Sequence, residues 1–583
     1  MHKYVKVQLP DLRVIDVMVD FSIKTFGAVS NLCKRLGINH AEELSFQKPL
    51  TSDDLAYNYR EDPRRRPVKV KRLDTNEFVV SHSNGSANPR KPANPGTPNQ
   101  SFGYSPYNTL NGTLHNASFD AADSFNQDSF AHSDASIKDV KGGLIHPRTL
   151  NEKARMNKSW LDSSLSLMEQ GFKEWDSLSL KFKFYSFYDL NPKTDAIRIN
   201  QIYEQAKWQI LNEEIDCSED EALMFAALQF QVRESRFWPV ANDVTDFGGE
   251  DEIDAALTEL QISLEGSNMN GALRGMSKVP VLEDELRFMK QKKFVLKSFK
   301  PYNFVCKDTI LYIHKGSTDG EPEYSIQLKG CEVTPDVSVS QKKYCIKLEV
   351  PSEDGMQEMW IRCNNEEQYA RWMAACRLGS KGKSLADPTY DPEVKSILSF
   401  LSMQKPSPAP AITSNDMEID PEEYLPLKFL KKGRNRLSQR ILEAHANVKD
   451  MNNIQAKMNY IQAWQRLPLY GISLFIVRFD DAKKDELLGV GFNKLVKLDS
   501  QTAHHLKTWR LSSMKSWDIN WEVKKMRIHF EKEQENLIFS IASADCKVFH
   551  EFLGGYIFLS MRSKDANQTL NEELFHKLTG GWV

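Results

Sequence analysis

Several short motifs in the sequence resemble catalytic or metal-binding signatures, and each lacks a partner that the chemistry requires. Asp246-Phe247-Gly248 matches the metal-binding tripeptide of protein kinases, but no His-Arg-Asp loop or glycine-rich strand precedes it. Gly379–Ser384 resembles a phosphate-binding loop, but Arg377 stands where that loop needs a glycine. His504 and His505 have no companion at metal-ligand spacing, and adjacent strand residues point to opposite faces. We therefore predict no catalytic residues, no metal and no cofactor.

Clustered cations could instead bind anionic partners. One run holds six cations within nine residues: Arg64, Arg65, Arg66, Lys69, Lys71 and Arg72. At about 1 kcal/mol for each cation near an anionic leaflet, this run can contribute to membrane binding, and salt weakens the effect. A nuclear-import signal and a plain solvated loop are the competing interpretations.

A second set of lysines surrounds a predicted strand and turn near residue 294. Its members are Lys292, Lys293, Lys297 and Lys300, with Lys342 and Lys343 as a possible second wall. A loop of this kind can hold a phosphate group between ammonium groups. The competing interpretation is a solvated lysine-rich turn.

An acidic segment over residues 254–265 carries leucines along one side, at Leu257, Leu260 and Leu264. Leucines at positions i and i+4 of a helix suit the groove of a partner protein. They suit packing onto the chain's own helices equally well, so both interpretations stay open.

The elements that must position these residues begin with a compact first lobe. Alternating residues predict strands at Tyr4–Leu9 and Val14–Val19, and helical spacing predicts a helix from Thr25 that ends at Gly37. Residues 80–137 are rich in Ser, Asn and Pro without periodicity, which predicts a disordered insert. The alternation at Leu178–Tyr185 predicts a strand that completes the opening sheet.

Helical and strand patterns then follow one another. Helices are predicted from Asp195 and over Glu219–Arg233, the second with Ser218 as its N-cap. Short strands recur over residues 287–384 and end in a helix at Asn365–Arg377, the pattern of a pleckstrin-homology (PH) domain, with Trp372 assigned to the core. A long helix with an apolar stripe from Val448 to Trp464 follows. Helices on both sides of the PH pattern indicate that it splits a helical lobe.

The last segment repeats the plan of strands followed by one helix. Three well-phased strands lie at Phe475–Phe479, Met526–Phe530 and Leu537–Ile541, and the closing helix covers Asp545–Arg562.

Composition sets wider limits on function. The 583 residues carry 76 Lys and Arg against 79 Asp and Glu, a net charge of −3, which gives no indication of a nucleic-acid partner. The longest apolar runs, such as Ile472–Val477, are far shorter than the roughly 20 residues of a spanning helix. The 8 dispersed cysteines predict reduced thiols in a cytosolic protein.

A ubiquitin-like lobe, a helical lobe and a PH-like lobe in this order form the FERM arrangement, and the sequence resembles the kindlins (fermitins) essentially from end to end. The motifs that carry the resemblance are Trp160–Ser164, Asp189–Gln201, Tyr203–Trp208, Leu328–Val337, Tyr369–Leu378, Phe552–Ser560 and Lys577–Val583. Kindlins carry a further ubiquitin-like lobe before the first FERM lobe, and we expect that lobe to be missing here.

The resemblance implies a multidomain α+β fold. Its parts are a ubiquitin-like lobe, an acyl-CoA-binding-protein-like helical lobe split by a PH domain, and a PH/PTB-like β-sandwich lobe with a C-terminal helix. The expected bounds are 1–190 with an insert at about 73–142, then 191–275, 276–385, 386–466 and 467–583.

The resemblance also implies a cytoplasmic adaptor, peripheral at the plasma membrane in focal adhesions and associated with the cytoskeleton. Such an adaptor binds integrin β cytoplasmic tails and phosphoinositide membranes, and promotes integrin activation and cell-matrix adhesion assembly. Talin-cooperating and paxillin-type adhesion proteins are further expected partners. The alternatives are a FERM-type membrane–cytoskeleton linker and a regulatory part of a signalling protein without integrin binding.

The family's functional residues carry over to matching positions only. A Gln-Trp pair needed for binding the integrin tail matches Ser516 and Trp517, with Ser in place of Gln, whereas we assign Trp521 to the core. The basic run matches a stretch that contacts anionic lipid, and the second set of lysines lies in the lipid-binding PH domain. Leu260 and Leu264 match leucines that dock on the pseudokinase integrin-linked kinase.

Overall fold

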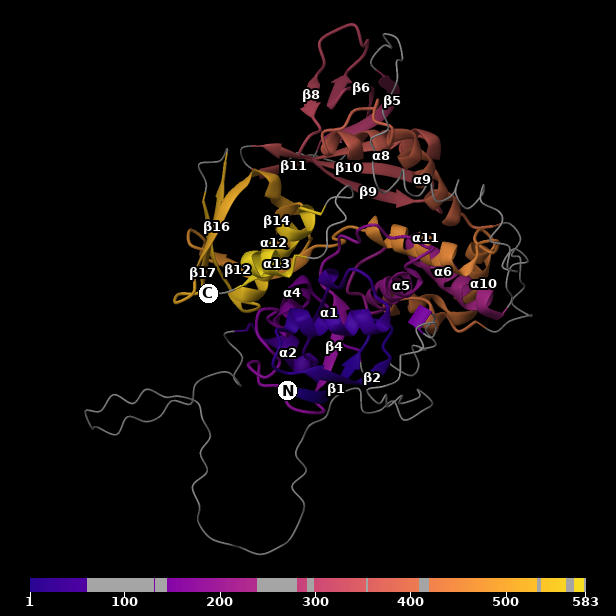
Figure 1. Cartoon of the computed structure of the whole chain (residues 1–583). Coiled ribbons are helices and arrows are strands. Elements are labelled where there is room, and N and C mark those ends of the chain that lie inside the picture. Colours follow the sequence, from indigo (N-terminus) through magenta and orange to yellow (C-terminus); the bar gives the residue numbers. More distant parts are fainter. Residues whose placement is uncertain are drawn as a thin grey trace, which may run out of the picture.

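Four groups of elements make up the structure, a computed structural model of the chain (Figure 1). It describes residues 1–59, 130–131, 144–237, 280–290, 298–352, 355–407, 419–531, 536–562 and 571–580. In Figure 1 the N-terminal lobe lies at the bottom, the helical lobe at the right, the PH-like lobe at the top and the last lobe at the left.

The N-terminal lobe is a four-stranded sheet in the order β2-β1-β4-β3 with helix α1 beside it. Its elements are β1 (His2–Gln8), β2 (Val14–Asp20), α1 (Thr25–Leu36), β3 (Leu44–Gln47), α2 (Ser52–Ala56), α4 (Leu150–Met156) and β4 (Ser177–Phe182). Strand β4 pairs in parallel with β1 and antiparallel with β3, so the predicted completion of the opening sheet across the insert is confirmed. Gly37 ends α1 with a φ of 75°, a left-handed conformation that glycine adopts without strain.

The helical lobe is built from helices that precede and follow the PH-like lobe. They are α5 (Ala196–Leu211), α6 (Glu219–Phe237), α10 (Arg434–His445) and α11 (Asn453–Gln465). The prediction of one long helix from Val448 to Trp464 is wrong at its start. Asn452 and Gln455 form a capping box that begins α11 at Asn453, so Val448 lies in the preceding turn.

The PH-like lobe contains a seven-stranded sheet in the order β8-β7-β6-β5-β11-β10-β9, covered by α8. Its elements are β5 (Val281–Lys290), β6 (Lys300–Lys307), β7 (Ile310–His314), β8 (Tyr324–Gln327), β9 (Glu332–Ser338), β10 (Lys343–Ser352), β11 (Gly355–Cys363), α8 (Glu366–Ser380) and α9 (Tyr390–Met403). Trp372 on α8 is fully buried, as predicted, and its Nε1 donates to Asp284 on β5 at 2.8 Å. The strand predicted at residue 294 lies outside the described residues, and the first described strand, β5, begins earlier.

The last lobe repeats this plan with the strand order β15-β14-β13-β12-β18-β17-β16. Its elements are β12 (Ser473–Phe479), β13 (Glu486–Gly491), β14 (Lys494–Leu498), β15 (His505–Arg510), β16 (Met514–Asn520), β17 (Lys525–Phe530), β18 (Leu537–Ile541), α12 (Cys546–Ser560) and α13 (Glu572–Thr579). The three predicted strands and the closing helix are confirmed as β12, β17, β18 and α12. The sequence pattern did not predict α13, which packs against α12.

Buried charges join the lobes to one another. The Glu43 carboxylate of the N-terminal lobe accepts hydrogen bonds from Arg198 of α5 at 2.8 and 2.9 Å and from Arg562 after α12 at 3.3 Å. Lys183, just after β4, forms an ion pair of 2.7 Å with Glu551 of α12, and both side chains are buried. The N-terminal lobe therefore contacts the helical lobe and the last lobe through ion pairs shielded from water.

The PH-like lobe lies against one edge of the last lobe's sheet. Glu349 of β10 pairs with His505 of β15 at 2.6 Å, and Glu332 of β9 pairs with Lys494 at 2.6 Å and with Arg510 at 3.1 Å. At Gly355, where β11 begins, a Cβ would stand only 3.0 Å from the Leu506 carbonyl oxygen. This close approach covers β15, the strand at one end of the sheet.

Candidate functional site

The opposite end of the last lobe's sheet is formed by β16. Among the described strands it pairs only with β17, and the pairing shifts register between Met514 and Ser516. A strand at the end of a sheet presents backbone N–H and C=O groups that an added strand can bind. Since the PH-like lobe covers β15, β16 is the end of this sheet that a peptide could extend.

Trp517 lies on this end strand and is half-buried against the apolar core of the last lobe. Its indole Nε1 donates a hydrogen bond of 3.0 Å to Nδ1 of His550 on α12. Trp521, which follows β16, is also half-buried, and its ring meets the His550 ring edge-on with centroids 5.9 Å apart. Trp521 was predicted to be a core residue, and the structure instead gives it a boundary position.

We call Ser516, Trp517, Trp521 and His550 the Trp517 face. Ser516 is exposed on β16 directly before Trp517. An extended peptide paired with β16 would therefore run beside aromatic side chains that are partly open to solvent, and aromatic residues are the usual anchors of protein interfaces. This combination of backbone and aromatic groups suits peptide binding.

Of the six lysines proposed for lipid binding, the structure describes Lys300, Lys342 and Lys343. Lys300 is exposed at the start of β6, the strand that follows β5 in the chain. Strand β10 starts at Lys343 and runs toward the end of the sheet where β5 ends, because β10 and β5 both pair antiparallel with β11. Through Phe288 and Ile361, Lys300 is level with Ile346 of β10. Lys343 therefore lies three residues, about 10 Å, farther from the end of β5 and three strands away from β6.

Lys343 is also engaged within the lobe. Its Nζ forms an ion pair of 2.7 Å with Asp336 of β9. This ion pair ties Lys343 to β9, whereas Lys300 lies on β6, three strands away from β10. The order of strands is information that the lysine spacing alone does not contain.

Three groups of predicted site residues lie outside the described residues. They are Lys292, Lys293 and Lys297 of the PH-like lobe, the basic run Arg64, Arg65, Arg66, Lys69, Lys71 and Arg72, and the leucines Leu260 and Leu264.

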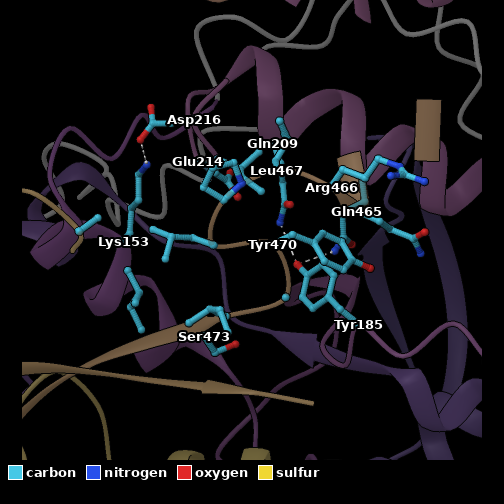
Figure 2. Close-up of a pocket in the computed structure, with 18 of the residues that line it drawn as sticks. Lys153, Tyr185, Gln209, Glu214, Asp216, Gln465, Arg466, Leu467, Tyr470 and Ser473 are labelled. Atoms are coloured by element: carbon cyan, nitrogen blue, oxygen red, sulfur yellow. Dashed lines mark hydrogen bonds and ion pairs between the residues drawn. The ribbon is translucent and has the colours of Figure 1, made fainter. Parts of the chain in front are cut away.

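A cavity of about 590 Å³ lies where the lobes meet (Figure 2). Tyr185 and Tyr470 line it, and the Tyr185 hydroxyl accepts a hydrogen bond of 2.8 Å from Gln209 of α5. Burial raises the pKa of Tyr185 to about 12, so this hydroxyl stays protonated. Lys153 in the cavity wall is paired with Asp216 at 3.3 Å. With neutral hydroxyls and paired charges, the cavity is a junction between lobes and shows no catalytic arrangement.

Three further properties of the described residues concern metal binding, cysteines and membrane spans. No group of three or more His, Cys, Asp or Glu side chains in the described part could hold a metal ion. All 8 cysteines are free, and all except Cys217 are buried, as the sequence predicted for reduced thiols. Within the same residues, no helix has the length and apolar character needed to cross a membrane.

His550 contacts Trp517 at the candidate site, and the sequence analysis did not single it out. It lies between Val548 and Phe552 in an apolar helix. A single histidine among apolar residues could have indicated a buried polar contact. Its partner Trp517 is 33 positions away, and periodicity cannot reveal a contact of that kind.

Comparison with known proteins gives the family. The FERM central domain model matches residues 189–475. Human fermitin family homolog 2 is 44% identical over 100% of this chain and 86% of its own length. Protein unc-112 of Caenorhabditis elegans is 40% identical over 100% of this chain and 87% of its own length. The structure of the FERM and C-terminal domain complex of Drosophila Merlin matches with 10% identity and a TM-score of 0.41, over 96% of this chain and 97% of that one.

The FERM central domain match and the full-length match to fermitins confirm the predicted FERM fold. Fermitins are FERM adaptors of cell adhesion and not enzymes, which agrees with the incomplete catalytic motifs. Because a fermitin homolog matches the whole of this chain at 44% identity, the chain belongs to the fermitin (kindlin) family.

Proposed function

We propose that this fermitin is a cytoplasmic adaptor that binds integrin β cytoplasmic tails and phosphoinositide membranes. By doing so it promotes integrin activation and the assembly of focal adhesions linked to the cytoskeleton. The observation that carries the proposal is the Trp517 face, where an open strand end lies beside a half-buried indole. Membrane cytoskeleton linkage without integrin binding is the outcome that the experiment below must exclude.

The tail would bind by extending the sheet at β16. Backbone hydrogen bonds from β16 supply affinity that depends little on sequence, and Trp517 supplies an apolar contact that selects the peptide. Ser516 is exposed at the same point of the strand, so it can contact the tail as the family's glutamine does.

Lipid binding is proposed for the turn between β5 and β6, with Lys292, Lys293, Lys297 and Lys300, and for the basic run at residues 64–72. The position of Lys300 at the start of β6 supports the first site. We leave Lys342 and Lys343 out of this site. They lie where β10 begins, and β10 runs in the same direction as β5, so they lie farther from the end of β5 than Lys300 does.

Integrin-linked kinase is the proposed partner of the acidic segment at 254–265, through Leu260 and Leu264. Talin-cooperating and paxillin-type proteins are proposed as further neighbours in the adhesion. Co-precipitation of the kinase tests the leucine contact, and an unchanged yield with the double variant Leu260→Asp/Leu264→Asp would remove it from the proposal.

A paired set of variants tests the central proposal. Trp517→Ala should weaken binding of an integrin β tail peptide by roughly thirty-fold or more, the size expected for a truncated aromatic hot spot. It should leave binding to vesicles containing phosphoinositides unchanged. Charge reversal at Lys293 and Lys297 should do the opposite, since each cation contributes about 1 kcal/mol at an anionic surface. Anisotropy of a labelled peptide and vesicle sedimentation give the two affinities.

Matched controls exist for each arm. Trp175→Ala removes a tryptophan of the N-terminal lobe that is 52% exposed, and it should leave tail binding unchanged. Charge reversal at Lys342 and Lys343 should affect vesicle binding little. Wild-type tail affinity in Trp517→Ala would refute integrin binding at this face and favour the linker without integrin contact.

A further inference from the structure

His550 connects the indole of Trp517 to the C-terminal part of the chain. Its Nδ1 lies 3.0 Å from Trp517 Nε1, and its Nε2 lies 2.9 Å from the carbonyl oxygen of Gly580. An indole N–H can only donate and a carbonyl oxygen can only accept. Nδ1 is therefore the acceptor and Nε2 carries the hydrogen, so the two partners fix one neutral tautomer.

The surroundings of His550 favour this neutral ring. The side chain is 8% exposed and lies close to both Trp517 and Trp521. Burial, helped by the charge of Lys547, lowers the pKa of His550 to about 4, although the Gly580 carbonyl, Glu551 and Asp162 act in the opposite direction. Near neutral pH the ring can therefore accept the indole hydrogen.

The Gly580 carbonyl is held in place by the packing of α13. Phe575 of α13 stacks on Phe26 of α1 with ring centroids 4.3 Å apart. Gly554 of α12 lets α13 approach closely, since a Cβ there would stand 2.1 Å from the Leu578 carbonyl oxygen. The Gly580 N–H donates to His576 at 2.7 Å. The helix is thus fixed between the last lobe and the N-terminal lobe.

We propose that His550 is a positioning residue for tail binding, which holds Trp517 in its binding orientation and takes its own orientation from the Gly580 carbonyl. The inference rests on the proposed function and extends it to α13, which lies outside the strand that the tail would pair with. Without this link the half-exposed indole would be ordered only by the tail, and ordering one side chain costs up to about tenfold in affinity.

Two substitutions at His550 separate positioning from simple packing. His550→Phe keeps a ring but loses both hydrogen bonds, and it should weaken tail binding by about tenfold. His550→Gln offers an acceptor and a donor, and it should bind within about threefold of wild type. The same change to Phe at His445, a buried histidine of α10 whose Nε2 lies 2.7 Å from the Gln231 side-chain oxygen, should leave tail binding unchanged.

The Trp517 indole provides a readout that packing alone would not restore. With 5-fluorotryptophan incorporated, the ¹⁹F resonance of Trp517 (assigned with Trp517→Phe) should stay narrow in wild type and His550→Gln. It should shift and broaden in His550→Phe. The positioning role would be overturned if His550→Phe and His550→Gln both lost tail affinity and both showed a shifted, broadened ¹⁹F resonance.

Gly580→Ala tests the link from the other side without changing His550 or Trp517. A Cβ at this position would stand 2.3 Å from the His576 carbonyl oxygen, so the Gly580 carbonyl must move. Gly580→Ala should lose tail affinity by about the same factor as His550→Phe. If His550→Phe fails to fold, Gly580→Ala alone tests whether the Gly580 carbonyl orients His550.

Trp517→Ala, measured in parallel, distinguishes the two proposals. If Trp517→Ala binds the tail like wild type, the proposed function itself fails. If Trp517→Ala binds weakly while folded His550→Phe and Gly580→Ala bind like wild type, only the positioning inference fails.

Discussion

Glu43 is fully buried and receives cations from two other lobes, Arg198 of the helical lobe and Arg562 of the last lobe. The Tyr188 N–H also donates to this carboxylate, at 3.0 Å. Removing one partner of a buried ion pair leaves the remaining charge without compensation. Glu43→Gln should therefore lower the free energy of unfolding by roughly 3–5 kcal/mol. Urea denaturation measures this change.

Glu42 provides the matched control, since it is the preceding residue and pairs with Arg562 at 2.9 Å. Burial acts to raise the pKa of Glu42, but His40 and Arg562 outweigh it and lower that pKa. Glu42→Gln leaves the Arg198 pair intact, so the loss should be about 1 kcal/mol. Equal losses in the two variants would contradict the special role of Glu43.

Residue types alone identified some of these positions. Trp372 could be assigned to the core because it lies in a helix with apolar neighbours. Trp517 could be assigned to tail binding because of the resemblance to kindlins. The link from Trp517 through His550 to Gly580 was not, because it joins three elements whose proximity depends on how β16, α12 and α13 pack. Hydrogen bonds between distant segments leave no periodic trace in a sequence.

At the scale of elements, the contact between β10 and β15 depends on a buried carboxylate. Glu349 of β10 is fully buried between Lys347 and His505. Burial acts to raise its pKa, yet hydrogen bonds and charges from His505 and Lys347 lower the pKa from 4.5 to about 2. Glu349→Gln should loosen the PH-like lobe and lower the hydrogen-exchange protection of β15 amides by roughly tenfold.

The sign of the pH dependence follows from that pKa. A carboxyl group with a pKa lowered on folding contributes its full stabilisation above the unfolded value of 4.5, and the contribution is lost as the pH falls toward 2. Protection of β15 should therefore decline as the pH falls below about 4.5. In Glu349→Gln the change in hydrogen-exchange protection of β15 between pH 5 and pH 3 should be smaller than in wild type.

Glu486→Gln is the control for this variant, since it removes a half-exposed partner of Lys497 within the last lobe. Half-exposed pairs contribute little, so protection of β15 should not change. If Glu349→Gln also leaves it unchanged, the PH-like lobe is held by other contacts.

Elements with strong local signals were predictable. Helix α1 and strands β1 and β2 followed from spacing, and the Ser218 cap marked the start of α6. The residues of the capping box at Asn452 are also present in the sequence. The apolar stripe extends back to Val448, however, and it led to a helix predicted to begin too early. Strand order could not be predicted, so the spacing of the lysines did not show that Lys343 and Lys300 lie on strands three apart in the sheet.

At the scale of the whole molecule, tail and lipid sites on one chain should act together. Once one site is bound, the other meets its ligand at an effective concentration in the millimolar range. Vesicles that carry both an integrin β tail peptide and phosphoinositides should bind the chain about a hundredfold more tightly than vesicles carrying either ligand.

The variants proposed above provide the controls for this measurement. Trp517→Ala should reduce binding to the mixed vesicles to the level of lipid alone. Charge reversal at Lys293 and Lys297 should weaken binding to the mixed vesicles but keep it above the level of tail alone, because the basic run at residues 64–72 is still present. If the mixed vesicles bind no more tightly than the stronger of the two single-ligand vesicles, the sites cannot be occupied together.

The cover that the PH-like lobe places over β15 has a consequence for solubility. A sheet with two uncovered end strands can stack edge to edge with further copies, and such stacking leads to aggregation. In this protein the inserted lobe shields one of the two ends of the last lobe's sheet, with Gly355 close to the backbone of β15. A chain from which the PH-like lobe had been excised would expose that strand, and the insertion thus protects the adaptor from self-assembly while it leaves β16 open for a partner.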